Sequence, residues 1–315
     1  MKERDCIENS DTKISIIMTT YNGEKYLKGQ LLSIENQTIK ADEVLIFDDC
    51  STDSTVEIIK DFIKEYKPKN WYLYINKNNL GWKRNFIQGI LKAKGKIIFL
   101  SDQDDIWFVN KIEKMVMVMD KYENIQVLSC NIRVIYNDNT QPKIRRSAKK
   151  YKIKRLEKVQ LNGSTYRPIR PGCAYAFSKD ILPDIKRLWF DDIAHDSLIW
   201  SIGLMRGTLY ILNEALMYQV RHEGNNTPSN EKTCRRRIEL IKFRKELSLH
   251  LLGNMQDILE ENKIWIRQYI NAAEERLVFL KKGGIISYLA LLRYVKYYPK
   301  LESWIGDYIA FLNKG

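Results

Sequence analysis

The stretch KIIFLSDQDD, residues 96–105, combines the pattern of a buried strand with a cluster of acidic residues directly after it. Apolar residues 97–100 are typical of a buried strand, because a short continuous run of Ile, Phe and Leu fits the interior of a sheet. The run stops abruptly, and three carboxylates follow within four positions: Asp102, Asp104 and Asp105. Carboxylates this close repel one another unless a cation, a partner or water relieves them.

Further apolar runs alternate with helical patterns on both sides of this stretch. Strand-like runs occupy residues 14–18, 43–47, 71–75, 96–100 and 125–130, and apolar residues recur at helical spacing in 24–37, 54–66, 84–94 and 109–122. This alternation predicts an α/β fold with a mostly parallel sheet flanked by helices. Ligands of such sheets bind at the carboxyl ends of the strands, where the acidic residues fall.

Two helix starts carry a capping-box pattern, Ser54 with Glu57 and Asn110 with Glu113. Because Asn110 caps the helix after the acidic cluster, the cluster itself is left without a structural role. A solvated turn is the simpler interpretation. We predict instead a hard divalent cation, Mg²⁺ or Mn²⁺, which binds carboxylates and completes its shell with phosphate oxygens.

The composition constrains the partners and the compartment. Lys and Arg number 52 against 39 Asp and Glu, a net charge of +13 that favours an anionic partner such as a nucleic acid, a lipid surface or a phosphorylated substrate. The five cysteines are scattered without C-x-x-C spacing, which fits a reducing cytoplasm. The N-terminal residues lack a signal peptide's apolar core, and the longest apolar run near the C-terminus is too short to span a bilayer. We therefore expect a soluble protein, or one attached to a membrane from one side.

Other strand ends also carry polar side chains. Thr19 and Tyr21 follow the first strand and could line a nucleotide pocket, and Asp49 follows the second and could accept a hydrogen bond from a base or a ribose. Lys83 and Arg84, beside a glycine turn, could meet a diphosphate. Neither the dinucleotide-binding glycine pattern nor a P-loop occurs.

The ordered set of these motifs resembles family 2 glycosyltransferases of the GT-A fold. The segments are ISIIMTTYNGEKYL (14–27), EVLIFDDCSTDST (43–55), NLGWKRN (79–85) and LSDQDDIW (100–107), and the SDQDDIW part is similar to the rhamnosyltransferase-like branch. The resemblance implies that Thr19, Tyr21 and Asp49 contact the nucleoside of the donor. It also implies that Asp102 and Asp104 form the D-x-D pair, with Asp104 the direct metal ligand.

The resemblance extends to two segments nearer the C-terminus. In IAHDSLIW (193–200) it implies that Asp196 is the general base, with His195 its neighbour or an acceptor contact; a helix cap is the alternative for Asp196. VRHEGNNTPS (220–229) resembles a family segment whose His approaches the metal or diphosphate. Here His222 comes one place early and Glu223 fills the usual slot, so either could reach the metal.

The chain is therefore expected to have two parts: residues 1–230, a GT-A nucleotide-sugar transferase domain with an exposed basic loop at 138–170, and residues 231–315, a C-terminal appendage of basic amphipathic helices. Those helices could rest on an anionic membrane, pack in a homodimer or cover the catalytic domain.

The function implied is an inverting, metal-dependent glycosyltransferase. It would move a sugar such as rhamnose from dTDP-rhamnose or a UDP-sugar to a surface-polysaccharide or lipid-linked glycan, on the cytoplasmic side of the membrane. The alternative is a Mg²⁺-dependent nucleotidyltransferase acting on a sugar phosphate, although no glycine-rich triphosphate loop opens the chain. We expect no nucleic-acid partner, because the basic run KIRRSAKKYKIKR has a single aromatic residue.

Overall fold

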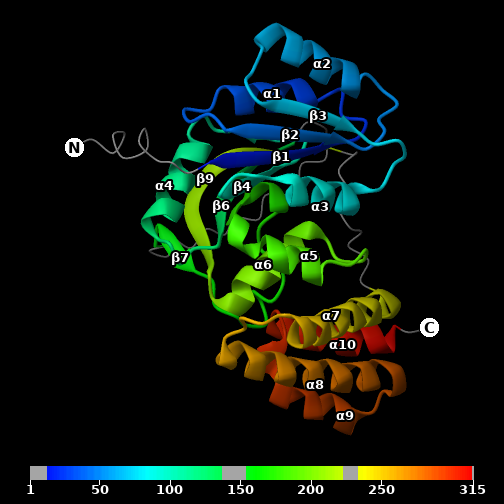
Figure 1. Cartoon of the computed structure of the whole chain (residues 1–315). Helices are drawn as coiled ribbons and strands as arrows, with labels where there is room; N and C mark the ends of the chain where they lie inside the picture. Colours follow the sequence, from blue (N-terminus) through cyan, green and yellow to red (C-terminus); the bar gives the residue numbers. More distant parts are fainter. Residues whose placement is uncertain (1–12, 137–153, 223–232, 314–315) are drawn as a thin grey trace. The chain divides into compact units, whose positions relative to one another are not determined.

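A computed structural model describes residues 13–136, 154–222 and 233–313 (Figure 1). The described strands form one nine-stranded mixed sheet in the order β3-β2-β1-β4-β8-β6-β9-β5, with β7 paired to β9. The strands are β1 (Ile14–Thr20), β2 (Glu43–Asp48), β3 (Trp71–Ile75), β4 (Ile97–Ser101), β5 (Ile106–Trp107), β6 (Val127–Tyr136), β7 (Leu156–Lys158), β8 (Tyr175–Ser178) and β9 (Leu209–Arg221).

The first half of the sheet is the parallel core that the sequence predicts. Strands β1 to β4 pair in parallel, and β1, β2 and β4 are buried along their whole length. Strands covered on both faces need continuous apolar runs, and such runs allow this half of the sheet to be predicted from the sequence. The connecting helices are α1 (Leu27–Glu35), α2 (Thr55–Tyr66), α3 (Trp82–Lys92) and α4 (Lys111–Lys121). The α/β fold with flanking helices is confirmed.

The strand order places a switch point between β1 and β4. The chain runs outward from β1 to β3 and then returns past both strands to form β4 on the other side of β1. Right-handed crossovers in opposite directions put α3 on the opposite side of the sheet from α1 and α2, as Figure 1 shows. Ligands of open α/β sheets bind where the strand order reverses, which is here at the carboxyl ends of β1 and β4. Those ends carry Thr19 and Asp102.

The second half of the sheet was not predicted in detail. Strand β8 is antiparallel to both β4 and β6, and the long strand β9 pairs in parallel with β6 and antiparallel with β5 and β7. The exposed loop expected at 138–170 is confirmed in part where the structure describes it: residues 154–170 are mostly exposed turns and bends, but residues 156–158 form β7 and Tyr166 is buried. Residues 137–153 of that loop lie outside the described residues.

The helix starts are confirmed, but the capping boxes are wrong. Helices α2 and α4 begin directly after Ser54 and Asn110, yet neither side chain makes a capping hydrogen bond. Glu113, the expected partner of Asn110, accepts a hydrogen bond from the Thr38 hydroxyl instead (2.8 Å). The Thr55 N–H donates to Asp53 Oδ1 (3.0 Å). At α4 a tertiary neighbour thus occupies the predicted partner of Asn110, whereas at α2 the nearby Asp53 accepts the bond from the start of the helix.

Two compact units divide the chain. The first holds the sheet, comprising residues up to 158, 170–200 and 208–225, with α5 (Leu182–Leu188) and the first half of α6 (His195–Arg206). The second gathers residues 159–169, 201–207 and 226 onward. Its helices, labelled in Figure 1, are α7 (Cys234–Asn254), α8 (Glu260–Lys282), α9 (Ile285–Ala290) and α10 (Leu301–Leu312), with a 3₁₀ turn at Leu291–Tyr297.

A buried ion-pair group holds the C-terminal helices together. Asp307 of α10 is fully buried and accepts hydrogen bonds from Arg276 Nε of α8 (2.8 Å), Arg237 Nη1 of α7 (3.0 Å) and the Tyr298 hydroxyl (2.9 Å). An aromatic cluster of Tyr166, Trp265, Tyr269 and Tyr297 forms a second contact region in this unit. Among the described residues, none of the helices is long and apolar enough to cross a membrane.

Candidate active site

The turn after β4 carries the acidic cluster and is tied to the end of β1. Gln103 accepts a hydrogen bond from the Tyr21 N–H (2.8 Å) and donates from its amide to the Tyr21 carbonyl (3.0 Å). Gly23 makes this possible, because a β-carbon there would lie 2.4 Å from Gln103 Oε1. The motif at 18–27 and the motif at 100–107 are thereby brought together across the switch point.

Asp104 lies beside His222, although 118 positions separate them in the sequence. His222 Nε2 is 2.9 Å from Asp104 Oδ2, and the imidazole stacks on the Tyr26 ring with centroids 4.2 Å apart. Strand β9 delivers His222: Ile106 pairs with Tyr218 and Trp107 with Met217, and this antiparallel register carries the end of β9 past the acidic turn. The two residues expected at the metal are therefore neighbours. Glu223 lies outside the described residues.

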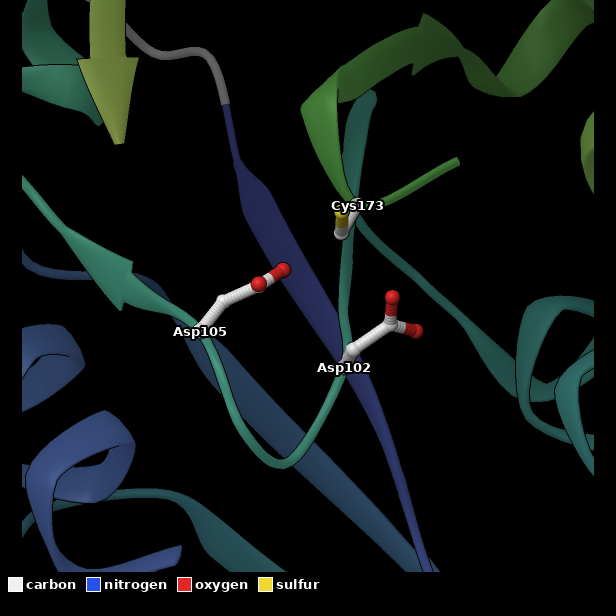
Figure 2. A group of neighbouring side chains, drawn as sticks. All are labelled: Asp102, Asp105 and Cys173. Atoms are coloured by element: carbon white, nitrogen blue, oxygen red, sulfur yellow. The ribbon is translucent and has the colours of Figure 1, made fainter. Parts of the chain in front are cut away.

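A second group is formed by Asp102, Asp105 and Cys173. One carboxylate oxygen of each aspartate and the thiol sulfur all lie within 4.8 Å of one another. Figure 2 shows the two carboxylates rising from the two sides of the turn, with the Cys173 thiol above them. Asp105 Oδ2 is buried without a hydrogen-bond partner among the described residues. A carboxylate oxygen left in this state fits a divalent cation, whereas the thiol is a soft ligand that does not suit Mg²⁺.

Burial and mutual repulsion shift the acid–base properties of this group. Burial raises the pKa of Asp105 to about 7, against the opposing effect of the Cys173 thiol and the Lys111 ammonium. Burial and the charges of Asp105 and Asp104 raise the pKa of Asp102 well above its usual value, and burial does the same to the pKa of the Cys173 thiol. A bound cation would reverse these shifts by stabilising the ionised carboxylates.

A buried lysine lies beneath the cluster. Lys111, the first residue of α4, is completely buried, and its Nζ donates to the Cys173 carbonyl (2.7 Å) and lies 3.7 Å from the centroid of the Trp107 ring. Its charge lowers the pKa of Asp105, while burial lowers the pKa of Lys111 itself. A fixed cation here partly offsets the repulsion within the acidic cluster.

Asp196 lies in the first turn of α6 and close to the acidic cluster. Its Oδ1 accepts a hydrogen bond from the Ser197 N–H (2.6 Å), and its negative charge contributes to raising the pKa of Asp102. A β-carbon at Gly172 would lie 3.0 Å from Asp196 Cβ and 2.9 Å from His195 Nε2. The backbone before β8 therefore approaches this helix as closely as only glycine permits.

His195 is an interior residue. It is 4% exposed, with its ring centroid 3.9 Å from that of Phe86 and 5.7 Å from that of Trp82. Burial lowers its pKa to about 4, so the imidazole is neutral near pH 7. Its Nδ1 is buried without a hydrogen-bond partner within the described ranges.

The three candidate nucleoside contacts differ in their surroundings. Thr19 is 9% exposed at the end of β1, whereas Tyr21 is 46% exposed. Asp49 is buried and holds the loop before α3: its Oδ1 accepts from the Leu80 N–H (2.8 Å) and its Oδ2 from the Gly81 N–H (2.8 Å). Asp49 thus has a structural task in ordering the loop that leads to Lys83.

Lys83 and Arg84 both contact the loop before α6. Lys83 Nζ donates to the Asp192 carbonyl (2.8 Å), and the Arg84 guanidinium makes a two-point ion pair with Asp191, including Nε to Oδ1 at 2.8 Å. These contacts place the two cations on the side of Asp196. None of the contacts described by the structure joins Lys83 or Arg84 directly to the acidic cluster.

The chain belongs to glycosyl transferase family 2, whose sequence profile matches residues 15–185. The predicted family is thus confirmed. The chain is 27% identical over 248 residues to the dTDP-rhamnosyl transferase RfbG of Shigella flexneri, covering 73% of this chain and 82% of that protein. It is also 24% identical over 294 residues to an uncharacterized glycosyltransferase of Rickettsia typhi, covering 88% of each.

Solved glycosyltransferase structures share the fold. Staphylococcus aureus TarS 1-349 in complex with UDP-GlcNAc superposes with a TM-score of 0.64 at 18% identity, over 96% of this chain and 89% of that one. The mannosyltransferase PcManGT of Pyrobaculum calidifontis in complex with GDP-Man and Mn²⁺ gives a TM-score of 0.56 at 14% identity, over 96% and 88%.

Sequence reasoning missed three residues of this site. Cys173 lies about seventy positions from the acidic turn and carries no local signal. Lys111 looks like any lysine at the start of a surface helix, and Gln103 like the middle residue of a turn. Asp105 belongs to the acidic cluster in the sequence, but nothing in the spacing of the three aspartates indicates that Asp105 is the buried one.

Proposed function

We propose that this glycosyltransferase is inverting and metal-dependent and uses a nucleotide-diphosphate sugar, dTDP-rhamnose or a UDP-sugar, as its donor. The observation that carries the proposal is the convergence at the switch point: Asp104 contacts His222, and Asp104 and Asp196 both lie near enough to Asp102 to raise its pKa. The rhamnosyl donor named for RfbG and the UDP-GlcNAc bound to TarS support this donor class.

Asp102, Asp104 and His222 are the residues that would hold the ion. Carboxylate oxygens suit both Mg²⁺ and Mn²⁺, and an imidazole nitrogen suits Mn²⁺ better. Bound there, the ion supplies positive charge where the leaving diphosphate gathers negative charge. The GDP-Man and Mn²⁺ complex of PcManGT supports Mn²⁺ as one candidate.

Asp196 is proposed as the general base that accepts a proton from the acceptor hydroxyl. In an inverting reaction the nucleophile attacks from the face opposite the leaving group, so base and diphosphate must flank the sugar. Asp196 comes from α6, whereas the acidic turn follows β4. Because the two groups belong to different elements, they would lie on different sides of a bound sugar. Gly172 keeps the Asp196 carboxylate from being displaced.

The donor would extend from the acidic turn along the strand ends. We propose that Thr19, Tyr21 and Asp49 contact the nucleoside, with Asp49 acting in part through the loop that it orders. Lys83 and Arg84 would contact the donor only by exchanging their present partners in the loop before α6.

The acceptor is proposed to be a growing surface polysaccharide or a lipid-linked glycan, and the site of action the inner face of the cell membrane. Residues 1–230 would carry the transferase chemistry, and residues 231–315 would form the appendage. The relation to a dTDP-rhamnosyl transferase supports rhamnose as the sugar, with another hexose as the alternative.

Calorimetric titration with dTDP, UDP and GDP, in Mn²⁺, in Mg²⁺ and in EDTA, tests the donor and the metal. We expect metal-dependent binding that Asp104→Ala abolishes and that Asp61→Ala, an exposed carboxylate on α2, leaves unchanged. Binding of similar strength in EDTA would refute the metal requirement.

Asp196→Asn tests the base. The variant should bind the donor like the wild type but lose turnover by about a hundredfold or more, because only the proton transfer is removed. Sugar transfer to a glycan acceptor, followed by analysis of the new anomeric centre, decides between inversion and retention. Normal turnover by Asp196→Asn would assign the base elsewhere.

A further inference from the structure

Helix α10 has an apolar face that nothing in the described chain covers. Its sequence LESWIGDYIAFL contains two charged residues, and one of them, Asp307, is buried. A helix that is apolar nearly all round is normally enclosed by protein or lipid. Here one row of large side chains is instead 45% to 62% exposed: Leu301, Ile305, Ile309 and Leu312.

The other sides of α10 are already packed. Asp307 and Ala310 are buried, and Asp307 binds Arg237 of α7 and Arg276 of α8. Trp304 and Tyr308 pack against Tyr288 of α9, with ring centroids 4.4 Å and 4.7 Å apart. The exposed row is therefore the remaining side of a helix whose other sides have partners.

Helix α9, held against α10 by Tyr288, adds further exposed apolar side chains. Ile286 is 82% exposed, the highest value among the large apolar residues described as exposed. Scattered exposed apolar residues are ordinary, but a concentration on two neighbouring helices marks an interaction surface. We call this the α9–α10 surface and define it as Ile285, Ile286 and Leu289 of α9, Leu292 of the 3₁₀ turn that follows, and Leu301, Ile305, Ile309 and Leu312 of α10.

The charges of residues 281–300, which include α9 and lead into α10, are of one sign, although the exposed Glu302 follows in the first turn of α10. From residue 281 to residue 300 the sequence holds five Lys and Arg residues and no Asp or Glu. All five are exposed: Lys281, Lys282, Arg293, Lys296 and Lys300. Arg293 also pairs with Glu275 at 3.4 Å. Lysine is depleted at interfaces between protein copies, whereas lysines beside apolar side chains complement an anionic lipid surface.

We propose that the α9–α10 surface binds an anionic phospholipid bilayer, with both helices lying in the plane of the interface. Apolar side chains would enter the boundary of the acyl chains while the lysines reach the phosphate groups. None of the helices in the described ranges is both long and apolar enough to cross a membrane, and the proposed attachment is to one leaflet. The proposal stands independently of the proposed sugar transfer, although it suits a lipid-linked acceptor.

Vesicle co-sedimentation of the full chain tests this surface. The probes are phosphatidylcholine vesicles and phosphatidylcholine vesicles that contain phosphatidylglycerol. We expect binding to the anionic vesicles, weakened but not abolished when salt rises from about 0.1 M to about 0.5 M, since only the electrostatic part is screened.

The double variant Ile286→Glu/Ile309→Glu should reduce the bound fraction by about tenfold or more, because two side chains that would enter the bilayer become charged. The matched control is Leu249→Glu/Ile264→Glu, on α7 and α8, at positions 50% and 59% exposed. It adds the same charge and should change binding by less than about twofold.

Three results would overturn the proposal: no binding of the wild type to anionic vesicles, equal loss in the control variant, or a wild-type dimer that the Ile286→Glu/Ile309→Glu variant converts to a monomer without any lipid binding. Sedimentation equilibrium identifies the last case as an interface between copies. The nucleotide titration is run on the same samples. Loss of vesicle binding with intact nucleotide binding then separates failure of this proposal from failure of the proposed function.

Discussion

His195 should make the folded protein sensitive to mild acid. Its imidazole is enclosed by Phe86 and Trp82, and burial lowers its pKa from 6.5 to about 4. In the unfolded chain the same group takes up a proton near its ordinary pKa. As pH falls below about 6.5, the unfolded state binds a proton that the folded state refuses, so the free energy of unfolding falls.

The size of the effect follows from the two pKa values. Stability from this group is fully present above about pH 6.5 and is lost progressively as pH falls toward about 4. Linkage gives a loss of roughly 2 kcal/mol between about pH 7 and about pH 5, and roughly 3 kcal/mol by about pH 4. A loss of this size is a sizeable fraction of a typical domain's total stability.

The assay is urea unfolding at a series of pH values for the wild type and His195→Phe. The variant keeps an aromatic ring in the pocket and removes the titrating group. Its free energy of unfolding should fall less steeply than that of the wild type, the difference between the two changing by roughly 2 kcal/mol from about pH 7 to about pH 5. Ile193→Val, a buried substitution near His195, is the control and should shift the curve by a similar amount at every pH.

Parallel curves for the wild type and His195→Phe would refute the reasoning. They would mean that the buried imidazole takes up a proton in the folded state as readily as in the unfolded chain, for example because water enters the pocket. A steeper fall of the wild-type curve than of the His195→Phe curve toward low pH, with the control curve parallel to the wild type, would support a neutral interior histidine.

Three more predictions concern packing and charge. Gly172→Ala should lower kcat by about tenfold to a hundredfold with unchanged nucleotide affinity, because the new β-carbon displaces Asp196; unchanged kcat would contradict this. Asp307→Ala should cost about 3–5 kcal/mol in urea unfolding by leaving Arg276 buried without its carboxylate, and a loss below about 1 kcal/mol would count against it. Arg84→Ala should leave the urea midpoint unchanged, since its ion pair is exposed; a clear drop would show that the pair is structural.

The parallel half of the sheet could be predicted because its evidence is local. The strand predicted at 14–18 is β1, and those at 43–47 and 71–75 are β2 and β3, each within two residues at either end. Continuous apolar runs bounded by turn residues mark such strands whatever surrounds them. Strands β8 and β9, in the mixed half of the sheet, carry weaker patterns, since β8 is short and β9 only partly buried, and the sequence did not reveal them.

The capping boxes show how tertiary contacts override local spacing. Asn110 and Glu113 have the right residue types at the right separation, yet Glu113 binds Thr38, which comes from the connection after α1. The first residue of the helix could be predicted from the point at which the helical spacing of apolar residues begins. Which atoms satisfy its first N–H groups depended on neighbours that are remote in the sequence.

The candidate site divides in the same way. The sequence alone determined that carboxylates stand at the end of a buried strand, because hydrophobic periodicity and strand direction are written locally. Only the tertiary structure decided that Asp104 meets His222, that Asp105 turns inward to Cys173 and that Lys111 lies beneath them. Those contacts depend on the register of β9 against β5 and on the antiparallel pairing of β8 with β4. Both pairings are determined by packing over the whole sheet.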